Sequence, residues 1–226
     1  KQVIQVLKLM EQEIAERMVH VPFGLIKLPE GRMSSRQGKT IFLEEVFNKS
    51  IELVAEVIAA KNPLLAQRDD VARQVGIGAI VFGDLKNGRV KDVTFDWEDV
   101  LNFDGETGPY LQYTHARANA VLQKVGAVDW SYLEPSALTD EYALPLIKHI
   151  GGFPQEVEKA AELYEPSIIS RYLLDLAQAF NRFYHHSRII GQEEAVTNTR
   201  VAIVMATVTV LRTGLHLIGL EAPLEM

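Results

Sequence analysis

The spacing of apolar residues in the second half of this 226-residue sequence constrains the fold more than any other feature. Near the end of the chain these residues recur at steps of four, three, four and three, at Val204, Val208, Leu211, Leu215 and Ile218. This spacing places them on one face of a helix, although the many Val and Thr residues nearby are also typical of a strand. Similar patterns predict helices over 140–150, 154–163, 167–187 and 194–217. From Asp140 onward we therefore expect only helices, packed as a bundle.

Glycine and proline residues mark the expected boundaries between these helices. Gly151 and Gly152 lie between the first two predicted helices, and Pro154 begins the second. Glycine weakens a helix interior, and proline is tolerated in a first helical turn. Glu165 and Pro166 separate the second predicted helix from the third. We therefore expect the chain to leave the helical conformation at both places.

The first half of the sequence mixes helical and extended patterns. Apolar spacing predicts helices over 43–61, about 69–82 and about 110–125, and partly over 1–18. Short stretches at 20–26 and 90–95 are predicted strands, and Asn87-Gly88 is a strong turn signal between helix and strand. The predicted fold class is therefore mainly α, with an α/β part in the first half.

The composition excludes several classes of protein. A formal net charge of -7 argues against a protein that coats nucleic acid through overall positive charge. The sequence contains no cysteine, so it has no disulfide and no thiolate metal site. Its longest apolar run, 201–211, is much shorter than the roughly 20 residues that span a bilayer, and no signal peptide is visible. We therefore expect a cytoplasmic protein that does not enter a membrane.

The stretch from Pro29 to Thr40 ends in Gly-Lys-Thr, as a phosphate-binding P-loop does. Such a loop also requires a glycine five positions before the glycine that precedes Lys39. Met33 occupies that position, and its side chain would obstruct the approach of the backbone to a phosphate. The Walker interpretation therefore fails. The loop still combines two glycines, two serines and three cations within 31–39, which suits a polyanion.

Two other polar groupings do not predict a metal site. Asp96-Trp97-Glu98-Asp99 brings three carboxylates together, but without the alternating ligands and glycine of a calcium loop. Acidic residues at this spacing favour the start of a helix, where the helix dipole stabilises them. His185 and His186 are adjacent, so on a helix they point in different directions and cannot chelate one ion together.

Two helical segments carry patterns that each permit two interpretations. On 167–187, one face carries Arg171, Gln178, Arg182 and His185. This face is either an ordinary solvated surface or a ridge that contacts phosphates or unstacked bases, because arginine suits phosphate recognition. In the other segment, Tyr113 and Arg117 share one helix face, and Gln112 and His115 share another. Helix packing and RNA contact explain this segment equally well.

Three segments together resemble a known family. The loop from Gly31 to Gly38 resembles the Lys-Met-Ser-Lys-Ser loop of class I aminoacyl-tRNA synthetases, in the variant found in arginyl-tRNA synthetases. Phe95-Asp96-Trp97, followed by 108–117, resembles that family's entry into its anticodon domain. The last helices, through Ile218 to Met226, are similar to its C-terminal helical bundle. The resemblance covers essentially the whole chain.

The resemblance implies two domains. Residues 1–107 would form the end of a Rossmann-like α/β catalytic domain, with its phosphate loop and a stem-contact region. Residues 108–226 would form an all-α helical-bundle anticodon-binding domain. The family's other nucleotide motif, similar to His-Ile-Gly-His, is absent from this sequence. We therefore expect the C-terminal part of an arginine-tRNA ligase, inactive by itself.

The resemblance also implies roles for individual residues. It assigns catalysis at the ATP phosphates to Arg32, Ser34, Arg36 and Lys39, and nucleotide binding to Phe23, Gly24, Met33 and Ser35. Combined with the helix faces described above, it favours tRNA binding by Tyr113, Arg117, Arg171, Gln178, Arg182 and His185. The implied partners are tRNA(Arg), ATP with Mg2+, and arginine, whose pocket would lie outside this chain; the protein would be a monomer. Two alternatives stay open. One is another class I synthetase, of the cysteinyl or methionyl type, and the other is a non-catalytic helical RNA-binding module.

Overall fold

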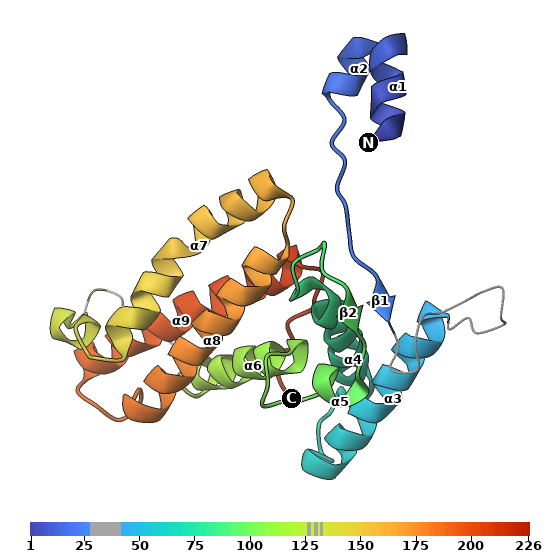
Figure 1. Ribbon diagram of the computed structural model, residues 1–226. Helices are drawn as coiled ribbons and strands as arrows, with labels where there is room; N and C mark the ends of the chain where they lie inside the picture. The colour runs from blue at the N-terminus through green and yellow to red at the C-terminus, as the bar shows by residue number, and fades with distance from the viewer. Residues whose placement is uncertain (28–41, 126–127, 129–130, 132) are drawn as a thin grey trace.

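The computed structural model describes residues 1–27, 42–125, 128, 131 and 133–226. The elements in chain order are α1 (Gln2–Met10), α2 (Gln12–Glu16), β1 (Ile26–Lys27), α3 (Leu43–Lys61), α4 (Arg68–Leu85), β2 (Val93–Thr94), α5 (Trp97–Val100), α6 (Gly108–Val125), the 3-10 helix η2 (Pro135–Leu138), α7 (Ala143–Leu163), α8 (Ser167–His186) and α9 (Glu194–Leu217). The described part is mainly helical (Figure 1), which confirms the predicted fold class.

The helical bundle of the second half is built around α9. This helix packs against α6, α7 and α8, and the four lie together in Figure 1. Phe180 and Phe183 of α8 and Leu211 and Leu215 of α9 are fully buried in their shared core. The apolar spacing that predicted α9 therefore supplies its buried face, as expected for a core helix.

By length and composition, α9 is also the one helix among the described residues that could cross a membrane. Half of its most apolar 18-residue window is buried inside the fold. Its neighbours α6, α7 and α8 cover that buried side. The apolar character of α9 is therefore explained by packing within the bundle.

Helix α7 is continuous from Ala143 to Leu163, where the sequence predicted two helices. Leu146 before Pro154 and Ala160 after it are both buried in the same core. Packing of α7 against α8 and α9 outweighs the backbone hydrogen bond that proline removes from a helix interior. The predicted break was therefore wrong, because tertiary contacts overrode the local preference.

Helices α3 and α4 form an antiparallel pair with a small core of their own. Helix α3 has the predicted bounds and ends just before Pro63. Val54 of α3 and Val75 of α4 are buried in this core, and Ser50 Oγ donates a 2.8 Å hydrogen bond to the carbonyl of Gly76. Helix α4 also packs against α6, which joins this pair to the bundle.

Strands β1 and β2 are shorter than the predicted strands. They pair in parallel, with Ile26 opposite Val93 and Lys27 opposite Thr94. Within the described residues, positions 20–25 have no strand assignment, so the prediction of a strand over 20–26 was largely wrong. A β-rich composition makes a strand only where a partner strand supplies hydrogen bonds.

The acidic stretch after β2 begins a helix, as predicted. Asp96 is the N-cap of α5, and its Oδ1 accepts a 2.8 Å hydrogen bond from the backbone N–H of Glu98. The ammonium group of Lys49 lies over the ring of Trp97, 4.8 Å from the ring centre. Asp96 is therefore explained as a helix cap, and Glu98 and Asp99 lie in the first turn, where the helix dipole favours acidic residues.

Helices α1 and α2 lie apart from the rest of the described fold (Figure 1). Helix α1 has no buried residue, and Leu9 and Met10 are 89% and 77% exposed. In α2, Ala15 is buried. The segment 17–25 connects α2 to β1 and crosses the space between these helices and the main body. The partly helical spacing of 1–18 is confirmed, with an interruption at Glu11.

Candidate nucleic-acid interface

An arginine lies between two tyrosine rings where α6 and α8 meet. The Cζ atom of Arg117 is 4.7 Å from the ring centre of Tyr113 and 5.6 Å from that of Tyr184. The two tyrosines are 39% and 37% exposed. Cation–π contacts of this kind hold a guanidinium in place while partly exposed rings stay accessible for stacking.

Asn181 fixes the orientation of this arginine. Its Oδ1 accepts a 2.9 Å hydrogen bond from Arg117 Nη1, and its Nδ2 donates a 2.9 Å bond to the hydroxyl of Tyr110. The sequence analysis missed both Asn181 and Tyr184. They lie three positions apart on α8, next to the face that carries the predicted RNA-binding residues, so a helical wheel shows their place beside that face but not their contact with Arg117.

The predicted RNA-binding residues of α8 are all exposed; this set, called the α8 stripe below, is Arg171, Gln178, Arg182 and His185. Arg171 Nη1 lies 4.0 Å from a carboxylate oxygen of Glu106. Within the described part of the chain, the side chains of Gln178 and Arg182 have no hydrogen-bond or ion-pair partner. The structure therefore confirms that this face is exposed, while its contact with RNA stays a prediction.

The opposite face of α6 is buried against the end of the chain. The side chains of Gln112 and His115 have no exposed surface. Gln112 Nε2 donates a 2.8 Å hydrogen bond to the carbonyl of Glu221, and His115 Nδ1 lies 2.9 Å from the carbonyl oxygen of Pro223. Burial lowers the pKa of His115 below its ordinary value. Helix packing therefore explains this half of the predicted pattern.

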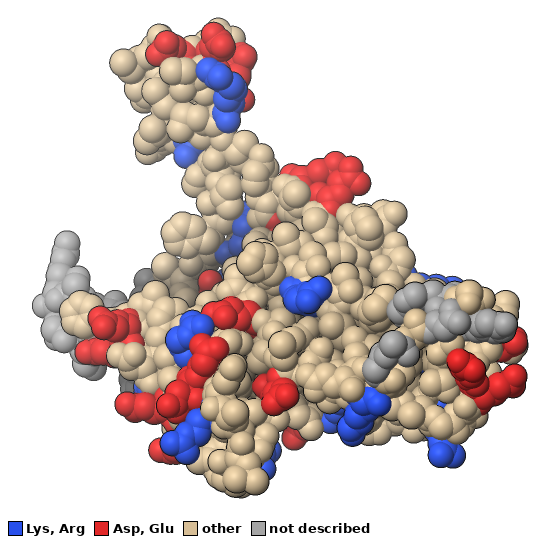
Figure 2. All heavy atoms as spheres, turned by 180° about the vertical axis from the view of Figure 1, so that it is seen from behind, with Lys and Arg blue, Asp and Glu red and all other residues tan. Residues whose placement is uncertain are grey.

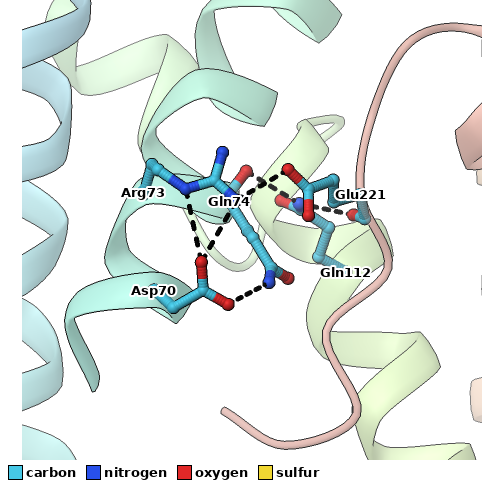
Figure 3. A network of polar contacts seen from close by, with 5 residues as sticks. All are labelled: Asp70, Arg73, Gln74, Gln112 and Glu221. Carbon is cyan, nitrogen blue, oxygen red and sulfur yellow. Dashed lines mark hydrogen bonds and ion pairs between the residues drawn. The ribbon is translucent and has the colours of Figure 1, made fainter. Parts of the chain in front are cut away.

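A polar network ties the same C-terminal segment to α4 (Figure 3). Arg73 Nη2 lies 2.9 Å from Glu221 Oε1 and 3.1 Å from Asp70 Oδ1. Gln74 donates a 2.7 Å hydrogen bond to the other oxygen of Asp70, and its carbonyl accepts one from Gln112. Hydrogen bonds to Glu221 and then to Asp70 raise the pKa of Arg73. The last residues of the chain thereby join α4 to α6.

Only two of the residues predicted to act on the nucleotide lie in the described part. The others, Arg32, Met33, Ser34, Ser35, Arg36 and Lys39, lie outside the described residues. Phe23 is 82% exposed. The N–H of Gly24 donates a 2.7 Å hydrogen bond to the carbonyl of Arg89, and a Cβ at Gly24 would lie 2.2 Å from the carbonyl oxygen of Lys91. Close backbone approach therefore explains Gly24, and its contact with a nucleotide stays a prediction.

Charge is mixed over the face of the molecule that Figure 2 shows. Acidic side chains are frequent over the side formed by α3 and α4, and basic side chains are interspersed among them. A polyanion would therefore have to be recognised by local groups such as Arg117 and the α8 stripe. Among the described residues, no three His, Cys, Asp or Glu side chains lie together as metal ligands.

Two family models match successive parts of the chain. Residues 1–97 match the catalytic domain of class I tRNA synthetases (R), and residues 111–226 match the DALR anticodon binding domain. The second match covers the four-helix bundle and the exposed cluster around Arg117. Together the fold and the two matches place the chain among the class I tRNA synthetases with a helical anticodon-binding domain.

Relatives and solved structures identify the particular family. The chain is 46% identical to the arginine–tRNA ligase of Halothermothrix orenii and 47% identical to that of an Exiguobacterium species, over 98% and 100% of its own length. It superposes on Thermus thermophilus arginyl-tRNA synthetase with a TM-score of 0.85 and 31% identity, over 99% of this chain. The chain belongs to the arginyl-tRNA synthetase family. It spans 39% and 40% of the length of the two curated relatives, and 38% of the Thermus chain.

Proposed function

We propose that this protein takes part in joining arginine to tRNA(Arg), with ATP as the energy source. Membership in the arginyl-tRNA synthetase family supports the proposal. The matched catalytic-domain model and the curated relatives are both specific to arginine, which argues against a cysteinyl or methionyl synthetase. This chain would supply the ATP-phosphate loop and the bundle that holds the anticodon stem and loop.

The proposed reaction has two steps. The carboxylate of arginine attacks the α-phosphate of ATP and releases pyrophosphate, and the terminal ribose of the tRNA then takes the arginyl group from the adenylate. Negative charge builds up at the phosphate in the first step, and one well-placed donor or cation is worth about 3–4 kcal/mol against that charge. Arg32, Ser34, Arg36 and Lys39 would supply those groups, alongside the Mg2+ that accompanies ATP. The nucleotide itself would be contacted by Phe23, Gly24, Met33 and Ser35.

The observation that carries the RNA-binding part of the proposal is the position of Arg117 between Tyr113 and Tyr184. A single-stranded loop is recognised by stacking its bases on aromatic rings and guanidinium planes, and by charge-assisted bonds to its phosphates. This cluster offers both kinds of contact on the exposed side of α6 and α8. The α8 stripe would extend the contact along the same helix as Tyr184.

A binding titration with tRNA(Arg) and a second tRNA tests this proposal. Tyr113→Ala is expected to weaken binding of tRNA(Arg) about tenfold, because stacking of one base on an aromatic ring is worth about 1–3 kcal/mol. Leu144→Ala, which trims a 44% exposed side chain on α7, is the matched control and should bind like the wild type. Equal affinity for both tRNAs would favour a general helical RNA-binding module. Unchanged binding by Tyr113→Ala would place the interface elsewhere.

We also propose that the protein works in the cytoplasm as a monomer. The curated relatives reported above are bacterial arginine–tRNA ligases, and the charged, cysteine-free composition suits a cytoplasmic enzyme. Sedimentation of the purified protein at several concentrations measures the oligomeric state. A mass that rises with concentration would contradict the monomer.

A further inference from the structure

One side chain connects the helical bundle to the segment that leads into the loop. Arg89 lies in the turn between α4 and β2. Its Nε donates a 2.9 Å hydrogen bond to the carbonyl of Tyr164, and its Nη1 donates a 3.0 Å bond to the carbonyl of Pro22. A longer contact of 3.4 Å joins its Nη2 to the carbonyl of Leu163. A single guanidinium therefore bridges the end of α7 and the segment before β1.

The backbone of Arg89 makes further links to the same two segments. Its N–H lies 3.3 Å from Glu165 Oε1, and its carbonyl accepts a 2.7 Å hydrogen bond from the N–H of Gly24. The side chains also form an ion pair, with Arg89 Nε 3.8 Å from Glu165 Oε2, and they are only 27% and 22% exposed. This partial shielding from water makes the ion pair stronger than one on a fully exposed surface.

The end of α7 is built to receive this arginine. Tyr164 ends the helix in the left-handed region, with φ of 51°, a conformation that costs a residue other than glycine roughly 1–2 kcal/mol. The last carbonyls of a helix have no partner within the helix and carry its negative dipole end. Leu163 and Tyr164 present such carbonyls to the guanidinium. A cap alone would need only these two bonds, so the third bond, to Pro22, needs a separate explanation.

The segment that receives the third bond has few other restraints. Val21, Phe23 and Leu25 are 42%, 82% and 52% exposed, so packing holds these side chains only in part. Beyond its contacts with Arg89, the segment is held at Leu25, whose N–H donates a 2.9 Å hydrogen bond to Asp92 Oδ1 and whose carbonyl accepts a 3.0 Å bond from the N–H of Val93. The short pairing of β1 with β2 follows directly after it. In the sequence this segment precedes β1 and then the predicted phosphate loop of 31–38.

We propose that Arg89 is a positioning residue that fixes the Pro22–Leu25 segment against the α7–α8 corner of the bundle. This inference rests on the proposed function, because it matters for catalysis only if the segment and the following loop meet ATP. Arg89 itself touches no reacting group. By fixing the Pro22–Leu25 segment, Arg89 sets the position from which the chain continues toward the predicted phosphate loop of 31–38. This position matters because a displacement of about 1 Å at a reacting centre can lower the rate about 100-fold.

Substitution of Arg89 in the full-length protein tests the inference. We expect Arg89→Ala to lower kcat for arginine-dependent ATP–pyrophosphate exchange about tenfold, to change KM for ATP less, and to leave the affinity for tRNA(Arg) within about twofold. Hydrogen exchange of a peptide covering 20–27 should become faster, while peptides from α8 and α9 should exchange as before. Arg89→Lys keeps the charge at the end of α7 but not the planar fork, so its kcat should lie between those of Arg89→Ala and the wild type.

The matched control is Arg68→Ala on α4, because the 60% exposed side chain of Arg68 pairs only with its sequence neighbour Asp69 among the described residues. Arg68→Ala should leave unchanged both kcat and the hydrogen exchange of the peptide covering 20–27. The inference would be overturned if Arg89→Ala kept the wild-type kcat and the wild-type rate of hydrogen exchange in the peptide covering 20–27. It would also be overturned if Arg89→Ala lost as much tRNA affinity as kcat. If Arg89→Ala does not fold, a wild-type kcat and wild-type hydrogen exchange of peptide 20–27 in Arg89→Lys would overturn the inference in the same way. A wild-type protein without ATP–pyrophosphate exchange activity would contradict the proposed function. Hydrogen exchange of the peptide covering 20–27 would then still decide the role of Arg89.

Discussion

The Nδ1 atom of His115 lies 2.9 Å from the carbonyl oxygen of Pro223, 108 positions further along the chain. A proton on Nδ1 allows the ring to donate this hydrogen bond, and Nε2 has no partner among the described residues. Burial lowers the pKa of His115 from its ordinary value of 6.5. The contact with Pro223 opposes this shift, and the positive charge of Arg212 adds to it. The neutral ring is therefore the form that fits the folded protein.

This geometry predicts that the protein loses stability in mild acid. The unfolded chain binds a proton at His115 more readily than the folded one, so the stability that the neutral ring contributes is complete above pH 6.5 and is lost as the pH falls through the lowered folded-state pKa. Thermal unfolding at about pH 7.5 and about pH 5.5 measures the loss. His115→Gln should show a smaller difference between the two conditions. His216→Gln, at an exposed position of α9, should behave like the wild type, and equal losses in all three proteins would refute the assignment.

The crossing of α4 and α6 predicts a sensitive glycine. A Cβ at Gly108 would lie 2.7 Å from the carbonyl oxygen of Gly78 and 3.0 Å from Phe82 Cβ. Gly108→Ala should therefore lower the free energy of unfolding by about 1–3 kcal/mol, because the helices must separate. Gly151→Ala on α7 meets no atom within 4 Å and should raise it by about 0.5–1 kcal/mol. Urea unfolding of both variants measures these changes. A wild-type free energy of unfolding in Gly108→Ala would contradict the close crossing of α4 and α6.

The α8 stripe predicts a salt-dependent loss of RNA affinity. If Arg182 contacts a phosphate, Arg182→Ala should weaken binding of tRNA(Arg) and reduce the slope of log K against log salt by about 1. Filter binding at two salt concentrations measures both. Lys159→Ala removes one positive charge from α7, where Lys159 pairs with Glu156, and is the charge-matched control. Identical curves for wild type and Arg182→Ala would leave the stripe as a solvated surface.

The loop predicts a kinetic signature. In the full-length enzyme, Arg36→Ala should lower kcat for adenylate formation more than it raises KM for ATP, because the cation acts on charge that develops in the transition state. A loss of about 100- to 1,000-fold is the order expected for one such group. Steady-state ATP–pyrophosphate exchange separates the two constants. A change confined to KM would mean that Arg36 only binds ATP in the ground state.

The helices were predicted well where one apolar face and one stop signal agree. Helix α3 has its predicted bounds because its amphipathic pattern ends directly before Pro63. Helix α7 differs, because the benefit of burying Leu146 and Ala160 in one core is not visible in the local sequence around Pro154. The strand predicted over 20–26 was limited to its last residue by the lack of a longer partner, which again depends on the fold.

The candidate site was also predicted only in part, because the sequence shows contacts within one helix but not contacts between helices. The pairing of Tyr113 with Arg117 lies within one helix, so spacing along the sequence reveals it. Asn181 and Tyr184 join them from α8, about 70 positions away, and only the packing of α6 against α8 brings them together. Arg89 was missed because its carbonyl partners belong to the backbone, which carries no residue-specific pattern.

The return of the C-terminal segment to α4 and α6 has a consequence for folding during translation. The carbonyls of Met226 and Glu221 accept hydrogen bonds from Asn62 and Gln112, which are 164 and 109 positions earlier. A ribosome adds roughly 5–20 residues per second, so these amides emerge several seconds before their partners exist. Until then the side-chain amides of Asn62 and Gln112 lack these two acceptors, and α4 and α6 are joined only by their direct contacts, such as the hydrogen bond from Gln112 to the carbonyl of Gln74. A stop codon just before Glu221 would remove the bonds that Glu221 forms with Arg73 and Gln112, and would leave α4 and α6 with their direct contacts alone.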